Sequence, residues 1–146
     1  MALQMNAQLT GATGLTAMLN QCYIWSGYGM PANNTVLRIY PSTEPFPASA
    51  PANSTGLPGT HVLQYSTLTF SLTGGANVIS GGTVTAQASA AATLSWFSIQ
   101  GAPGSTAYLL ISDSIGLGGT GTILGVSNLT PALNEVVSIT FSMRFL

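Results

Sequence analysis

The sequence predicts an all-β protein: an antiparallel β-sandwich or jelly-roll-like fold with one short N-terminal helix. Three observations support this prediction. Apolar and polar residues alternate in many short segments, turn signals separate these segments at fairly regular spacing, and a single stretch has helical spacing. Such strands are typical of sandwiches and jelly rolls. The chain has 146 residues, 46% of them hydrophobic, which fits one domain with its own core.

The predicted helix spans residues 13–25, TGLTAMLNQCYIW. Four apolar side chains there follow the i, i+3, i+4, i+7 spacing of one helix face. These residues are Leu15, Met18, Leu19 and Cys22. The next residues, SGYGMP, end the helix with two glycines and a proline. We therefore divide the chain into an N-terminal arm, residues 1–12, and a single β-sandwich domain, residues 13–146.

Strands joined by loops are predicted for the rest of the chain. TVLRIY (35–40) is the first strand, and a proline-rich loop, residues 41–60, follows it. Because proline lacks an amide donor, this loop cannot be a central strand. HVLQYSTLTFSLTG predicts one long strand, and GANVISGGT predicts a turn-rich break. The remaining predictions are strands at 83–89, 93–99, 106–113, GTILGVSNL and EVVSITFSMRF, and a glycine-rich hairpin loop at 115–121.

Charged residues are rare in this sequence. Two are basic and three acidic, whereas about a quarter of the residues in a typical soluble domain are charged. They are Arg38, Glu44, Asp113, Glu135 and Arg144. A surface of hydroxyls and amides with a net charge of −1 has little self-repulsion, so copies tend to associate. We expect an assembled protein; the alternative is a monomer kept soluble by its hydroxyls and amides.

The composition argues against several partners. Two arginines cannot neutralise a row of phosphates, so we expect no nucleic-acid partner. Without a basic cluster or a long apolar run, we expect no membrane partner. One cysteine and one histidine do not make a metal site or a disulfide framework. We also expect no cofactor and no small-molecule substrate.

Groups suited to catalysis are scarce. A Ser–His–Asp arrangement could draw on His61 and Asp113, but no GxSxG elbow or other local context supports one. GLGGTG lacks the lysine of a phosphate-binding loop and is predicted to be a β-turn. We therefore interpret His61 as a structural or surface residue and predict no catalytic residue and no enzymatic activity.

Aromatic residues suggest an alternative function. Trp96 and Phe97 point to opposite faces of their predicted strand, so we expect one in the core and the other facing outward. Exposed aromatic side chains can anchor an interface or stack on a sugar. A glycan- or receptor-binding module that uses Tyr28, Tyr40 or Trp96 is therefore a second hypothesis.

Four segments follow the N-terminal helix in a distinctive order: LRIYPSTEPFPASAPANSTG, VLQYSTLTFSL, GTVTAQASAAATLSWFSIQG and GGTGTILGVSNLTPALNEVVSITFSMRF. In this layout the chain resembles small virion-associated proteins of tailed bacteriophages. The resemblance covers most of residues 12–146 and is one of layout and composition. The chain departs from the usual layout in one respect: the strand after the tryptophan is more polar and less acidic.

The resemblance implies a structural protein of the virion with no catalytic residues. Its main form is a capsid decoration (cement) protein, a β-rich homotrimer that bridges neighbouring subunits of the major capsid protein. It would be assembled in the host cytoplasm and lie on the capsid exterior. The alternative is a tail or fibre component bound to tail proteins. It is kept because the strand after the tryptophan differs from the usual layout, so the resemblance does not decide between attachment to the head and attachment to the tail.

Three segments are predicted to meet the partner: the N-terminal dozen residues, the loop 41–60 and the glycine-rich loop 115–121. Such segments can reach across a seam between subunits and order on contact. The residues expected at the partner interface are Leu3, Met5, Tyr28, Pro45, Phe46, Pro47 and Leu117.

Overall fold

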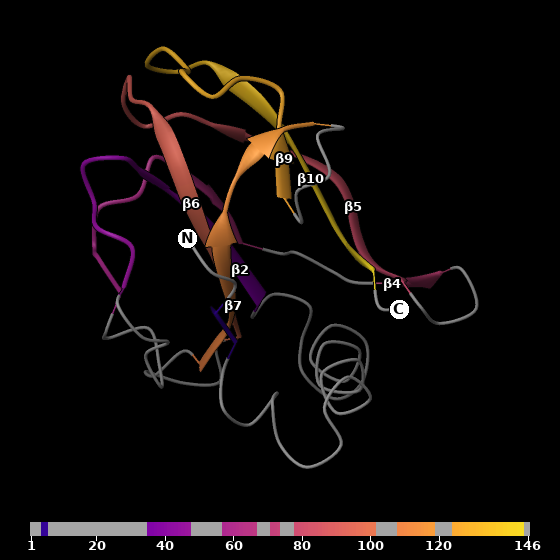
Figure 1. The fold of residues 1–146 in the computed structure, drawn as a ribbon. Helices are drawn as coiled ribbons and strands as arrows, with labels where there is room; N and C mark the ends of the chain where they lie inside the picture. The colour runs from indigo at the N-terminus through magenta and orange to yellow at the C-terminus, as the bar shows by residue number, and fades with distance from the viewer. Residues whose placement is uncertain are drawn as a thin grey trace.

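The described part of the protein consists of strands and the turns between them. The computed structural model describes residues 4–5, 35–47, 57–66, 71–73, 78–101, 108–118 and 124–144. These ranges contain ten strands and no helix (Figure 1). The prediction of an all-β protein is therefore confirmed for the described residues. The predicted helix at 13–25 lies outside them.

A first sheet contains five strands in the order β1-β7-β6-β2-β3, and all its neighbours are antiparallel. Its strands are β1 (Gln4–Met5), β2 (Thr35–Pro41), β3 (Leu63–Tyr65), β6 (Leu94–Gly101) and β7 (Tyr108–Ser114). The predicted strands at 35–40, 93–99 and 106–113 correspond to β2, β6 and β7, so local alternation located this sheet well.

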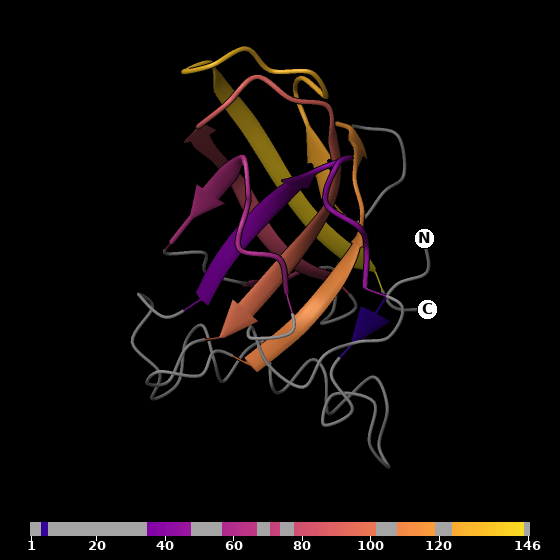
Figure 2. The same cartoon turned by 90° about the vertical axis from the view of Figure 1, so that its left-hand side faces the viewer.

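The second sheet also has five strands, in the order β4-β5-β10-β9-β8 (Figure 2). Its strands are β4 (Ser71–Thr73), β5 (Val78–Gln87), β8 (Gly116–Leu117), β9 (Leu124–Val126) and β10 (Val136–Arg144). The longest pairing joins β5 to β10, from Val136↔Gln87 to Arg144↔Val78. Only the β8–β9 pair is parallel among the pairings of the described residues.

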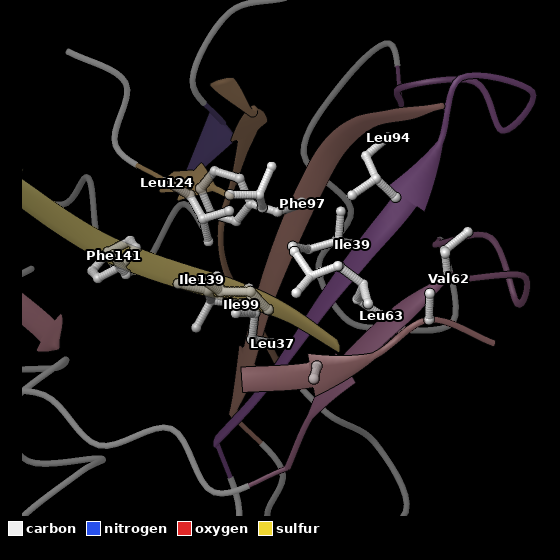
Figure 3. Close-up of a cluster of buried hydrophobic side chains, with 14 residues drawn as sticks. Leu37, Ile39, Val62, Leu63, Leu94, Phe97, Ile99, Leu124, Ile139 and Phe141 are labelled. Carbon is white, nitrogen blue, oxygen red and sulfur yellow. The ribbon is translucent and has the colours of Figure 1, made fainter. Parts of the chain in front are cut away.

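One apolar cluster is shared by the two sheets. Alternate residues of β2 and β6 point toward it from the first sheet, and alternate residues of β5 and β10 point toward it from the second (Figure 3). Its buried members are Leu37, Ile39, Val62, Leu63, Ala86, Ala88, Leu94, Phe97, Ile99, Leu124, Val126, Val137, Ile139 and Phe141. Burying each large side chain contributes about 1.5–3 kcal/mol, so this cluster is the main source of stability.

The prediction of one long strand in HVLQYSTLTFSLTG is wrong. β3 ends at Tyr65 and β4 begins at Ser71, and the two strands belong to different sheets. The alternation is continuous because both sheets bury one face. Periodicity therefore reports that a face is buried but does not report the sheet to which a strand belongs.

The turn-rich break predicted at GANVISGGT is wrong from Val78 onward, because β5 runs through its glycines. Gly82 has a φ of 65°, which glycine adopts without the steric cost that other residues bear. The β5–β10 register shifts beside it, between Phe141 and Ser142. The glycine therefore accommodates a β-bulge and does not end the strand.

The hairpin loop predicted at 115–121 is also corrected where the structure describes it. Gly116 and Leu117 form β8, parallel to β9, and the Gly118 amide donates to the Val126 carbonyl at 3.0 Å. A Cβ atom on Gly125 would lie 2.7 Å from the Gly118 Cα atom. Glycine is needed at Gly125 because the two backbones approach closely, which the sequence pattern does not distinguish from a turn.

Candidate functional site

The outer face of the first sheet carries a second apolar cluster, formed where the proline-rich loop meets β2 and β6. Tyr40 and Trp96 are opposite each other in the β2–β6 pairing, and their rings stack with centroids 4.0 Å apart and planes 14° apart. Phe46 packs edge-on against Trp96 with centroids 5.3 Å apart. Leu57 completes the group. We call these four residues the aromatic cluster.

Polar atoms in the aromatic cluster are hydrogen-bonded. The indole nitrogen of Trp96 donates to the Glu44 carbonyl at 3.0 Å, and the hydroxyls of Tyr40 and Ser98 lie 3.2 Å apart. The side chains of Tyr40, Trp96 and Ser98 are all 0% exposed. Since an unpaired buried polar group destabilises the fold, these bonds make burial of the outer face stable. The described ends of the loop, near Phe46 and Leu57, are thus fixed to the sheet.

The prediction that Trp96 and Phe97 point to opposite faces, with one of them in the core, is confirmed, but the outward residue is covered. Phe97 lies in the main cluster, and Trp96 points away from that cluster but is covered by Phe46. Both side chains are 0% exposed. The sequence pattern gave their opposite directions but not the cover, because Phe46 is distant along the chain. In this structure, neither Tyr40 nor Trp96 offers an open ring to a sugar.

The proline-rich residues predicted at the interface lie close to this cover. Pro45 is exposed, whereas Phe46 and Pro47 are half-buried. Phe46 has a defined contact within the chain through its ring on Trp96. Pro45 is therefore the best placed of the three to meet a partner, and Phe46 supports the loop from beneath.

The other predicted interface residues do not gather with the loop. Met5 is in β1, paired with Ile111 of β7 at the edge of the first sheet. Leu117 is 46% exposed and lies in β8 at the edge of the second sheet. Leu3 and Tyr28 lie outside the described residues.

His61 lies beside the aromatic cluster, with its ring edge-on to Tyr40 and the centroids 6.5 Å apart. Its Nδ1 atom is buried and has no hydrogen-bond partner among the described residues. Burial lowers the pKa of His61 below its ordinary value, the nearby charge of Arg38 lowers it further, and a backbone hydrogen bond with Gly59 opposes them. The side chain therefore favours the neutral form, as expected for a histidine that packs against the fold.

A hollow of about 380 Å³ adjoins His61. Its wall consists of residues 41–43, 60–62 and 89–93, and it presents mainly hydroxyl and alanine side chains. No acidic or basic side chain other than His61 is among these described lining residues. The described residues also contain no group of three His, Cys, Asp or Glu side chains that could hold a metal ion. The hollow can offer neutral hydrogen bonds only.

Arg38 and Glu135 have neutral partners within the chain. The Arg38 Nε atom donates to Gln64 at 3.0 Å, and Glu135 accepts from the Asn128 amide at 2.8 Å. Glu135 also accepts from the Ala132 amide at 2.8 Å. These bonds lower the pKa of the Glu135 carboxyl, with Asn128 as the larger cause. These charges hold turns and strands in place.

The outer face of the second sheet has a different character. Six exposed polar side chains point outward from β5 and β10, and we call them the hydroxyl face. They are Thr83, Thr85, Gln87, Ser138, Thr140 and Ser142. None of them is charged. The sequence shows this alternation in TVTAQ and SITFS, but the pairing of the two segments becomes visible only in the sheet.

Comparison with protein-family models, curated proteins and solved structures finds no match for this chain. In the described part of the chain, no helix is long and apolar enough to cross a membrane. The features that bear on function are the two outer faces and the described ends of the loop that cover one of them.

Proposed function

We propose that this protein is a non-enzymatic structural protein of a virion: a capsid decoration (cement) protein that bridges neighbouring subunits of a phage major capsid protein. The fold we propose for it is a β-sandwich, jelly-roll-like, built from the two sheets. The observation that carries the proposal is the neutral hydroxyl face, exposed along the longest strand pair of the described residues. A protein that stays bound to others buries much of its surface, and burying a charge without a partner is costly.

The anchored loop supports the same role. A structural clamp binds through area, shape and backbone contacts and needs no reactive group. Phe46 and Leu57 hold the described ends of the proline-rich loop against the sheet, and Pro45 remains exposed beside them. Because less of such a loop has to be ordered on binding, a partner meets a smaller entropic cost. In this proposal, the described ends of the loop form a preformed contact surface.

Imaging of purified virions from the source phage by electron cryomicroscopy tests the proposal. We expect density for this chain on the outside of the head, with Pro45 and the edge strands near a seam between capsid subunits. Density on the tail would assign the protein to the alternative, a tail or fibre component. Absence of the chain from purified particles, checked by mass spectrometry, would reject a virion role.

A glycan-binding module is the second candidate, and the hollow beside His61 favours it. Its hydroxyl and alanine lining suits a neutral, hydroxyl-rich ligand. Binding would be detected with a glycan panel, followed by substitution of Thr43 or Thr93 on the wall by Arg. A complete lack of binding to the panel would remove this candidate.

A further inference from the structure

The hydroxyl face is regular because residues that are opposite in an antiparallel pair share one face. Thr85 is opposite Ser138, and Thr83 is opposite Thr140, with their hydroxyl oxygens 3.2 Å apart. Neighbouring side chains are spaced about 4.8 Å across the strands and about 6.8 Å along them. The next charged residue along β10 is Arg144, beyond the end of the face.

An apolar group adjoins one end of this face. Val136 is 63% exposed and is paired with Gln87 at the start of β10. Leu133, in the preceding turn, is 58% exposed. The Gln87 amide donates to the Asn134 carbonyl at 3.1 Å and so ties this turn to the face. Two of the three exposed large hydrophobic side chains of the described residues therefore lie at this end.

We propose that the hydroxyl face, together with Val136 and Leu133, is a self-association surface on which a second copy of this chain packs face to face. A hydroxyl group both donates and accepts a hydrogen bond, so a face of hydroxyls complements an identical face. The apolar end supplies the area that drives contact. The face carries no charge and the chain has a net charge of −1, so repulsion between copies is weak.

Other occupants fit this face less well. A strongly charged partner, such as a nucleic acid or an acidic protein, would lose solvation here and gain no opposite charge. The outer face of the first sheet is already covered around Trp96 by residues of its own chain. Among the outer faces that the structure describes, the hydroxyl face is therefore the one left for another copy.

Face-to-face packing of identical surfaces produces a two-fold pair, in which each copy contributes the same residues. It differs from the homotrimer that the phage resemblance implies. The face measures only about 10 Å by 20 Å from strand spacings, well below the roughly 800 Å² per partner of a stable interface. We expect a weak, concentration-dependent pair that neighbouring contacts strengthen in an assembly. This inference is independent of the proposed virion role.

Sedimentation velocity of the purified chain tests the proposal. We expect the wild-type protein to shift from monomer toward dimer as its concentration rises to the millimolar range. Thr85→Arg places like charges at the centre of the pair, and we expect it to weaken association by at least about tenfold. Ser66→Arg adds the same charge at an exposed position just after β3 of the first sheet and should associate like the wild type. Circular dichroism checks that each variant folds.

Charge pairing then tests the face-to-face geometry. Thr85→Glu alone should also fail to associate, whereas an equimolar mixture of Thr85→Arg and Thr85→Glu should form pairs again. If Thr85→Arg fails to fold, Ser138→Arg and Ser138→Glu replace the two variants, because Ser138 is the cross-strand neighbour. A wild-type protein that stays monomeric, an unaffected Thr85→Arg, or a mixture without recovery would overturn the proposal.

Discussion

The outer faces of the two sheets differ, although the sequence gives both the same kind of alternation. On the first sheet, the outward residues Tyr40 and Trp96 are fully buried because Phe46 and Leu57 cover them. On the second sheet, the outward residues of β5 and β10 are small, polar and exposed. The outer face of the first sheet is therefore buried around Tyr40 and Trp96 by its own chain, whereas the outer face of the second sheet is exposed.

This difference separates the buried face that stabilises the fold from the exposed face that we propose for association. Removing an aromatic side chain from the first sheet removes buried area that the fold needs. Changing a hydroxyl on the second sheet alters a surface that already faces water, and such substitutions usually change stability little. We therefore expect variants on the two outer faces to have opposite effects: the first lower stability, and the second alter association.

The largest expected effect is that of Trp96→Ala. The side chain is 0% exposed, so its loss should lower the free energy of unfolding by about 3–5 kcal/mol. Chemical denaturation measures this change. Thr85→Ala is the matched substitution on the hydroxyl face and should change stability by no more than about 0.5 kcal/mol. Equal losses in the two variants would contradict the contrast between the faces.

Gly125→Ala tests whether part of the second sheet is also sensitive to substitution, at the point where the backbones of Gly125 and Gly118 lie close together. The new methyl group would lie 2.7 Å from the Gly118 Cα atom, and a backbone atom cannot move aside easily. We expect a loss of about 1–3 kcal/mol, as for overpacked sites, measured by thermal unfolding. Gly59→Ala is the control, because no atom lies within 4 Å of its new methyl group. If both variants unfold like the wild type, the claim that the backbones of β8 and β9 leave no room for a side chain at Gly125 is wrong.

Phe46→Ala removes part of the cover and leaves the sheet beneath intact. Because Phe46 is only half-buried, we expect a loss of about 1–2 kcal/mol, less than for a fully buried aromatic residue. Trp96 would then meet water, so its fluorescence should shift to the red. Pro45→Ala, at the exposed neighbouring position, should leave the emission unchanged. An unchanged spectrum for Phe46→Ala would show that other residues shield Trp96.

The smallest expected effect is a pH dependence from His61. Its pKa is lower in the folded protein than its ordinary value of 6.5, so the unfolded chain binds the proton first as the pH falls. The contribution of His61 to the free energy of unfolding is therefore fully present above pH 6.5. It decreases as the pH falls from 6.5 to the pKa of His61 in the folded protein. His61→Gln should remove this decrease. A separate loss below pH 4.5 is expected from Glu135, whose carboxyl pKa is also lowered.

Much of the fold follows from local pattern. The predicted strands at 35–40, 93–99 and 106–113 and the closing segment EVVSITFSMRF correspond to β2, β6, β7 and β10. β10 is buried on one face and β6 on both, although both strands were predicted from alternation. Which strands share a sheet does not follow from it, because β3 and β4 continue one pattern in two sheets. The glycines were also ambiguous, because glycine occurs in β-bulges and at close backbone contacts as well as in turns.

The candidate site depended on contacts between distant parts of the chain. The position of Phe46 over Trp96 joins a loop to a strand 50 residues later, and no local signal encodes it. The hydroxyl face requires the register between β5 and β10, which the two segments do not specify separately. The polar residues of each segment were visible in the sequence, but the surface that they make together was not.

The central claim is that a second copy covers the outer face of the second sheet, and hydroxyl-radical footprinting tests it most directly. The three exposed large hydrophobic residues of the described chain serve as probes: Leu133 and Val136 beside the hydroxyl face, and Leu117 at the β8 edge. On raising the protein concentration, we predict slower oxidation of Leu133 and Val136 and an unchanged rate at Leu117. Equal rates at every concentration, or protection of Leu117 alone, would contradict the claim.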